Sequence, residues 1–148
     1  MSQLPELDEN GDLPPGVHQA TLVEVLERFG TGTLQRLAMA RRLENIFKLA
    51  SSTGAVSRVI VFGSFVTAKP DPNDIDVFML MENTFDVSEL AGQVALIFDH
   101  RTAQDYEGAS VFWIRRLAAL DGEKAVVEHW QIKRDGTNRG IVEVTSYD

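Results

Sequence analysis

The chain has 148 residues, of which 44% are hydrophobic and 24% charged, with no cysteine and a formal net charge of −8. This length and composition fit one globular domain, and the lack of cysteine excludes disulfides, cysteine-ligated zinc and thiol catalysis. The acidic balance argues against a nucleic-acid polymer as the main partner, because binding that backbone requires Lys and Arg to neutralise phosphates. No apolar run is long enough to span a membrane and the polar start does not resemble a signal peptide, so we expect a cytoplasmic protein without membrane contact.

The first part of the chain predicts an arm followed by two helices. Residues 1–16 are rich in acids and proline and are expected to form a flexible N-terminal arm, ahead of a single domain over residues 17–148. Apolar residues at helical spacing predict amphipathic helices over Ala20–Phe29 and Thr33–Ser51. Basic residues of the second helix, Arg36 among them, are interpreted as solvated surface.

The rest of the chain predicts a sheet and one further helix. Asp86 is expected to cap a helix that carries apolar residues at helical spacing as far as Phe98. Five runs are apolar or rich in β-branched and aromatic residues and are predicted to be strands: Arg58–Phe62, Asp74–Met81, Ala109–Ile114, Ala125–Ile132 and Ile141–Thr145. The last two strands are expected to pair as a hairpin. Together these elements predict an α+β domain with a mixed sheet of about five strands and helices packed mainly on one side.

Asp74 and Asp76 are two acids at the start of an otherwise apolar strand. In a strand, residues i and i+2 point to the same face with Cα atoms roughly 6.5 Å apart, so the two carboxylates converge while Ile75 and Val77 face the core. The repulsion between them is relieved if a divalent cation binds, and Mg²⁺ prefers one or two carboxylates together with substrate phosphate oxygens. We therefore predict that Asp74 and Asp76 are ligands of Mg²⁺ or Mn²⁺.

Gly63 and Ser64 end the preceding strand. A glycine allows close approach of the backbone, and the start of a following helix would present N–H groups to a phosphate. Ser64 adds a hydroxyl and Lys69 a counter-charge, so this turn and the two aspartates predict a nucleoside triphosphate site. The alternative is a plain tight turn, with aspartates that only cap the entrance of the second strand beside Asn73.

The order of these motifs resembles a known signature. Two apolar residues, Gly-Ser, nine residues and then Asp74-Ile75-Asp76-Val77 resemble the nucleotidyltransferases of the DNA polymerase beta superfamily, particularly the small bacterial minimal nucleotidyltransferases, although the loop is one residue shorter than usual. The stretches Leu-Pro-Pro-Gly-Val and Arg-Gly-Ile-Val-Glu are similar to an uncharacterised bacterial family within that group, and this likeness spans nearly the whole chain.

What the resemblance implies is a nucleotidyltransferase-like fold and a defined reaction. A nucleoside monophosphate, expected to be AMP, would pass from a nucleoside triphosphate, expected to be ATP, to a hydroxyl of a small molecule or a protein acceptor. The resemblance matches Gly63 and Ser64 with the turn that holds the phosphates, whereas Lys69 is a candidate only through its charge and its place in the connecting loop. It matches Asp74 and Asp76 with the catalytic metal ligands.

Active members of the superfamily typically carry a third carboxylate on a later strand, and the predicted strand Ala109–Ile114 contains no acid. Ser110 stands where the aspartate is expected, and Glu107 lies just before the strand. Glu128 alternates with apolar residues in the next predicted strand, so we take it as the candidate third catalytic residue. The alternative for Glu128 is an edge-strand glutamate that reaches solvent.

Two functions therefore stay open at this stage. The first is a metal-dependent nucleotidyltransferase. The second is a catalytically weak or inactive binding module with the same fold, such as an antitoxin-like component that acts with a partner protein, and the missing third acid motivates it. A purely structural domain leaves Asp74 and Asp76 unexplained. Trp113 and Trp130 are interpreted as core residues, not as platforms for a nucleobase.

Overall fold

A computed structural model describes residues 4–148 and leaves out the side chains of Tyr106 and Glu107. Its helices and strands follow in chain order: β1 (Val17–Ala20), α1 (Leu22–Phe29), α2 (Leu34–Ser51), β2 (Val56–Phe62), β3 (Ile75–Met81), α3 (Gln93–Ile97), α4 (His100–Glu107), β4 (Ala109–Arg115), α5 (Glu123–His129) and β5 (Ile141–Val144). Three short 3₁₀ turns lie between them at Ser64–Val66, Val87–Glu89 and Arg116–Ala118. No helix in this described part of the chain is long and apolar enough to cross a membrane.

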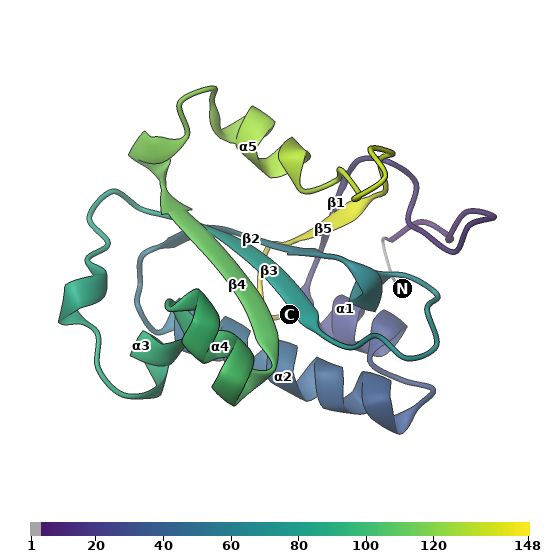
Figure 1. Ribbon diagram of the computed structural model, residues 1–148, viewed down its shortest axis with the longest axis horizontal. Coiled ribbons are helices and arrows are strands. Elements are labelled where there is room, and N and C mark those ends of the chain that lie inside the picture. Colours follow the sequence, from purple (N-terminus) through teal and green to yellow (C-terminus); the bar gives the residue numbers. More distant parts are fainter. Residues whose placement is uncertain (1–3) are drawn as a thin grey trace.

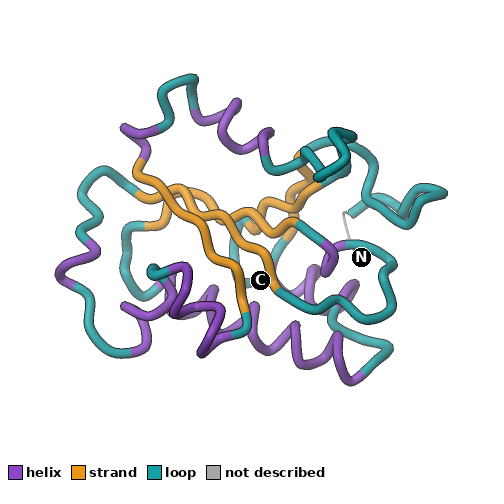
Figure 2. The backbone as a smooth tube through the Cα atoms, viewed as in Figure 1, coloured by secondary structure: helices purple, strands orange, loops and turns teal. Residues whose placement is uncertain are grey.

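The described strands form one five-stranded mixed sheet in the order β1-β5-β2-β3-β4 (Figure 2). The central strand β2 runs antiparallel to both β3 and β5, whereas β1 is parallel to β5 and β4 is parallel to β3. The predicted class, an α+β domain with a mixed sheet of about five strands, is confirmed. The sheet brings the end of β2 and the starts of β3, β4 and β5 to one edge of the molecule.

The helices cover the two faces of this sheet unequally. Helices α1 to α4 lie on one face and α5 lies alone on the other (Figure 1), as predicted for helices packed mainly on one side. Alternation along β3 divides its side chains between these layers. Ile75 and Val77 are buried in the larger core with α1 to α4, whereas Phe78 belongs to the smaller core under α5. Asp76 lies two residues before Phe78 in the strand, so its side chain points to the same face of the sheet, the one that α5 covers.

Both predicted N-terminal helices are present: α2 starts one residue after its predicted start, whereas α1 starts two residues after it because Ala20 ends strand β1. Thr21 caps α1 by accepting a hydrogen bond from the backbone N–H of Glu24 at 3.1 Å, and the Glu24 side chain reaches back to complete a capping box. Thr33 caps α2 in the same way from the N–H of Arg36 at 3.0 Å. These caps satisfy backbone donors that the first helical turn leaves without partners.

The predicted strand Ala125–Ile132 is wrong, because this segment lies mostly in helix α5. Its apolar residues fit both the two-residue period of a strand and the 3.6-residue period of a helix. Packing decides between the two, because Val126, Val127 and Trp130 fall on one helical face and pack on the sheet. The predicted hairpin with Ile141–Thr145 is therefore also wrong. β5 pairs instead with β1 and β2.

Two other differences concern short elements. The four-residue strand β1 was not predicted, because it follows a Pro- and Gly-rich stretch and has no clear alternation. The predicted helix from Asp86 is broken into the 3₁₀ turn Val87–Glu89 and helix α3, separated at Gly92, whose φ of +68° lies outside the helical region. A further helix, α4, follows it without having been predicted.

The expected arm makes buried contacts over residues 4–16. Leu13 is fully buried and Leu4 is 6% exposed, so both contribute to the larger core. The backbone of this segment also pairs with the loop after β2, where the N–H of Ala68 donates to the carbonyl of Gly11 at 2.8 Å. Burial of these two leucines was not predicted, because they lie far apart in a segment that is otherwise rich in acidic and polar residues.

Arg36 is not the solvated surface residue that the sequence suggested, because it is only 8% exposed. Its guanidinium donates to the backbone carbonyls of Phe29, Phe65, Thr67 and Lys69. Three of these carbonyls belong to the loop that follows β2. One buried cation therefore fixes the path of this loop, and burial lowers the pKa of Arg36 from its ordinary value.

Candidate functional site

The two predicted aspartates lie at the edge of the sheet where β2 ends and β3 begins. Asp76 is in register with Phe62 of β2 on one side and with Ser110 of β4 on the other. Asp74 immediately precedes β3, two residues before Asp76, as required for both carboxylates to lie on one face. The structure thus brings both acids together beside the residue that the sequence placed at the position of a third acid.

Gly63 leaves room for the Asp76 carboxylate. A side-chain carbon built at Gly63 would overlap the Oδ2 atom of Asp76, and the φ of +82° at this residue is rarely adopted by other residue types. The following turn, Ser64–Val66, is a single 3₁₀ turn, closed by the Thr67 N–H donating to the Ser64 carbonyl at 3.3 Å. Glycine is therefore required here by close approach as well as by backbone geometry.

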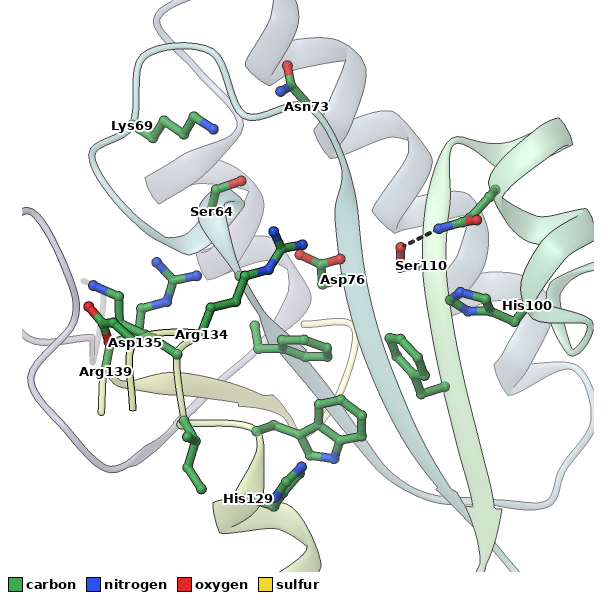
Figure 3. A pocket seen from close by; sticks show the side chains of 17 residues that line it. Ser64, Lys69, Asn73, Asp76, His100, Ser110, His129, Arg134, Asp135 and Arg139 are labelled. Carbon is green, nitrogen blue, oxygen red and sulfur yellow. Dashed lines mark hydrogen bonds between the residues drawn. The ribbon is translucent and has the colours of Figure 1, made fainter. Parts of the chain in front are cut away.

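Ser110 links the aspartates to helix α4. Its hydroxyl donates to Oδ2 of Asp74 at 2.7 Å. It also accepts from Nε2 of Gln104 at 3.0 Å, the contact drawn as a dashed line at Ser110 in Figure 3. Ser110 is 8% exposed, whereas Gln104 is exposed and Asp74 half-buried, so only the serine at the middle of this chain of contacts is shielded from solvent. The serine holds Asp74 in place but supplies no negative charge of its own.

The Asp76 carboxyl has a perturbed pKa. Burial raises its pKa first and the nearby charge of Asp74 raises it further, to about 6, although Arg139, Ser110 and Arg134 act in the opposite direction. A carboxyl with such a pKa ionises at a cost, and a bound cation would remove that cost by favouring the charged form. Perturbed carboxyl groups of this kind are common at functional sites, although structural networks also produce them.

The carboxylate of Asp76 faces a cleft with a volume of about 920 Å³. Of the residues predicted to hold a nucleotide, Gly63, Ser64 and Lys69 all line this cleft. Figure 3 shows Ser64, Lys69 and Asn73 on the segment that joins β2 to β3, with Asp76 near the middle of the view. The structure therefore assembles these predicted residues around one hollow.

The candidate third acid is not part of this assembly. Glu128 lies on α5 instead of a strand, is exposed, and its carboxylate is 3.8 Å from Nζ of Lys124. It does not line the cleft. The side chain of Glu107, the other acid considered, lies outside the described residues. The strand interpretation of Ala125–Ile132 caused the error, since it gave Glu128 an inward direction that a helix does not give.

Aromatic rings line the cleft beneath Asp76. Trp130 packs against Phe62 at 4.7 Å and Phe112 at 5.0 Å between ring centroids. All three residues line the cleft, yet Trp130 also belongs to the smaller core. Trp113, in contrast, packs in the larger core and donates its indole N–H to the Phe98 carbonyl. The core interpretation holds for Trp113, whereas Trp130 serves both the core and the cleft wall.

Sequence reasoning missed the residues that close the cleft on the side of β5. Lys133, Arg134 and Arg139 line it and come from the segment that joins α5 to β5. With Lys69 they give the cleft four Lys or Arg side chains against two acids, Asp76 and Asp135. The available signal was the basic segment Lys-Arg-Asp-Gly-Thr-Asn-Arg-Gly, which lies between the two runs that were expected to form a hairpin.

The donor atoms fit one hard cation. Asp74 and Asp76 supply carboxylate oxygens, the ligands that Mg²⁺ prefers, and Mg²⁺ commonly needs only one or two of them beside water and phosphate oxygens. Among the side chains that the structure describes, no group of three or more His, Asp or Glu is arranged to hold a metal. The chemistry of the pair matches two ligands of such a cation, and water or phosphate oxygens would have to supply the others.

Fold and site define an α+β protein with a pair of acids at one end of a mixed sheet, of which Asp76 lines a basic cleft and Asp74 does not. Residues 5–145 match the family DUF6932, which is described as a family of unknown function, and the chain belongs to this family. No curated protein and no solved structure gave a match to the chain.

Proposed function

We propose that this protein is a metal-dependent nucleotidyltransferase that moves a nucleoside monophosphate, expected to be AMP, from a nucleoside triphosphate to a hydroxyl of a small molecule or protein. The observation that carries the proposal is the position of the Asp76 carboxylate. It lies against Gly63 and beside Asp74, and it lines a cleft that Ser64 and Lys69 also line. The resemblance of the Gly-Ser and Asp-x-Asp pattern to nucleotidyltransferases supports the same reading.

In the proposed reaction, the acceptor hydroxyl oxygen bonds to the α-phosphorus of the triphosphate. The bond from the α-phosphorus to the oxygen that bridges to the β-phosphate breaks, and pyrophosphate leaves with the electron pair. The hydroxyl proton passes to a base or to solvent. Bound Mg²⁺ or Mn²⁺ would supply charge stabilisation for the phosphate oxygens, and Asp74 and Asp76 are the residues that would hold it.

The remaining residues bind and orient the substrate. Ser64 would donate its hydroxyl to a phosphate oxygen, and Lys69, exposed at the rim of the cleft, would add a positive charge. Arg36 contributes indirectly, because it fixes the carbonyls of the loop that carries Lys69. Positioning and neutralisation of charge are the main tasks of a protein in phosphoryl chemistry.

A transfer assay tests the proposal directly. ATP labelled at the α-phosphate is incubated with the protein, Mg²⁺ or Mn²⁺ and a panel of small-molecule and protein acceptors. We expect transfer by the wild type and loss of transfer in Asp76→Asn. Glu128→Gln is the matched control, since it removes an exposed carboxylate away from the cleft and should leave transfer unchanged. Equal labelling by wild type and Asp76→Asn would contradict the proposal.

The position of Ser110 favours a second candidate function, a nucleotidyltransferase-fold module that binds nucleotide with weak or no chemistry and acts with a partner protein. Ser110 is in register with Asp76, where an acid would complete the metal site, and its hydroxyl is engaged by Asp74. Without a third acid, assistance by a general base, typically a factor of about 10² to 10⁴, is missing.

Restoring the acid separates the two functions. If the wild type lacks only the third carboxylate, Ser110→Asp should raise the transfer rate by about 10²-fold or more with Mg²⁺, while Ser110→Asn should not. If wild type already transfers AMP with ordinary turnover and Ser110→Asp brings no gain, the binding-module candidate is refuted. A stoichiometric partner that co-purifies with the wild type would favour that candidate.

A further inference from the structure

The segment between α5 and β5, residues 133–139, concentrates positive charge on one wall of the cleft, and we call it the basic loop. Lys133, Arg134 and Arg139 all line the cleft, in a chain whose net charge is −8. A local excess of cations in an acidic protein is not required by solubility. It creates a local field that attracts anions into the hollow next to Asp76.

The basic loop is ordered by its own turn. The N–H of Gly136 donates to the Lys133 carbonyl at 3.0 Å, and the N–H of Lys133 donates to the Thr137 carbonyl at 2.8 Å. Asp135 accepts from both the backbone N–H and the hydroxyl of Thr137, at 2.9 and 2.6 Å. The loop therefore presents its cations from a hydrogen-bonded frame, which reduces the ordering cost of binding a ligand.

Asp12 pairs with two of the three cations. Its carboxylate lies 3.5 Å from Nζ of Lys133 and 3.6 Å from a guanidinium nitrogen of Arg139, and the residue is only 8% exposed. Among the described side chains, Arg134 is in no salt bridge. Arg134 is therefore the cation of the basic loop whose charge is least compensated.

Arg134 also lies toward the aspartates. Figure 3 shows its side chain extending from the loop toward Asp76, between Ser64 and Arg139. The charges of Arg139 and Arg134 both lower the pKa of Asp76, as expected for cations in the same hollow. An anion bound there would contact the basic loop on one side and the Ser64 turn on the other.

We propose that the basic loop is a polyphosphate-binding site, with Arg134 as the principal ligand-contacting residue. The ligand chemistry is a chain of two or three phosphates, either free or as the tail of a nucleotide. A guanidinium suits it because its planar fork pairs with two phosphate oxygens at once. Where the tail belongs to a nucleoside triphosphate, this inference rests on the proposed function and assigns Arg134 to the pyrophosphate that leaves.

Calorimetric titration tests the site with three ligands: inorganic triphosphate, ATP with Mg²⁺, and AMP. A charge-assisted contact predicts that Arg134→Gln raises the Kd for triphosphate and for ATP about 10- to 100-fold, while the Kd for AMP, which lacks the tail, stays within twofold. Arg101→Gln is the matched control, since it removes the same charge from an exposed site on α4 outside the cleft. Thermal unfolding of both variants checks that the fold is intact.

The outcomes separate this inference from the proposed function. Loss of triphosphate binding in Arg134→Gln without any AMP transfer by the wild type supports the site and refutes the enzyme. AMP transfer by the wild type, together with unchanged affinity of Arg134→Gln for triphosphate and ATP, supports the enzyme and refutes the polyphosphate site. An equal loss for AMP, or an equal effect of Arg101→Gln, overturns the inference, because either result would show that overall charge and not the tail contact governs binding.

Discussion

Replacing Asp76 with asparagine should make the metal-free protein more stable at neutral pH. A carboxyl whose pKa is raised from an ordinary 3.8 to about 6 disfavours its own ionised form in the fold. Each tenfold change in acidity is worth about 1.4 kcal/mol, so the ionised Asp76 lowers the free energy of unfolding by about 3 kcal/mol. For a chain of this size that corresponds to a gain in Tm of roughly 6–12 °C in Asp76→Asn.

The dependence on pH follows from the direction of the shift. Above about pH 6 the carboxyl is ionised in both the folded and unfolded states, so the wild type carries the full destabilisation. Between pH 6 and 4 the folded state keeps a proton on Asp76 that the unfolded state releases, so the destabilisation caused by Asp76 decreases as the pH falls. The advantage of Asp76→Asn should shrink toward zero near pH 4.

Thermal unfolding in the presence of a chelator, at pH 7.5 and at pH 4, measures this effect. Asp105→Asn, an exposed aspartate of α4, is the control and should change Tm little at either pH. Addition of Mg²⁺ should then favour the wild type, by about 2.7 kcal/mol when the cation is at 100 times its Kd, and leave Asp76→Asn nearly unaffected. A lower Tm for Asp76→Asn at pH 7.5 without metal, or an advantage that does not change with pH, would refute the reasoning.

Two further changes test the surroundings of the site. Gly63→Ala should lower the free energy of unfolding by about 1–3 kcal/mol and weaken Mg²⁺ binding, because the new carbon overlaps the Asp76 carboxylate. Gly136 has a similarly positive φ but open space around it, so Gly136→Ala is the control. The difference between the two variants in urea unfolding measures the cost of the overlap with Asp76, and equal losses of stability would show that the overlap costs nothing. Arg36→Met should cost on the order of 3 kcal/mol, since it leaves buried carbonyls without a donor, whereas the exposed Arg41→Met should fall within about 0.5 kcal/mol. Similar urea midpoints for these two arginine variants would show that the buried contacts contribute little.

The centre of the site could be predicted because its signals are local in sequence. The turn at Gly63 and strand β3 fall within twenty residues, with Asp76 in the strand and Asp74 immediately before it, so their spacing was enough to predict that they lie together. Ser110 was expected at the position of the missing third acid, and it lies opposite Asp76 because the predicted strand Ala109–Ile114 is β4, which pairs with β3.

The rest of the site depends on packing between distant segments. Helix α5 has a sequence that fits strand and helix equally, and only its packing on the sheet decides, so the direction of Glu128 could not be known. The partnership of Asp12 with Lys133 and Arg139 joins residues more than a hundred positions apart and leaves no spacing to detect. The buried role of Arg36 likewise depends on carbonyls from a loop that the helix meets only in the fold.

The N-terminal segment limits how far the cleft can open. It ties together the two loops on either side of the cleft, because the carbonyl of Gly11 accepts from Ala68, that of Leu13 accepts from Gly140, and Asp12 pairs with the basic loop. Because Leu13 is fully buried, the two loops cannot move apart unless these contacts break or Leu13 leaves the core. In the proposed transfer reaction, a bulky acceptor such as a folded protein would have to present its hydroxyl on a protruding, narrow feature, and a variant that starts after residue 13 should lose this selection by size.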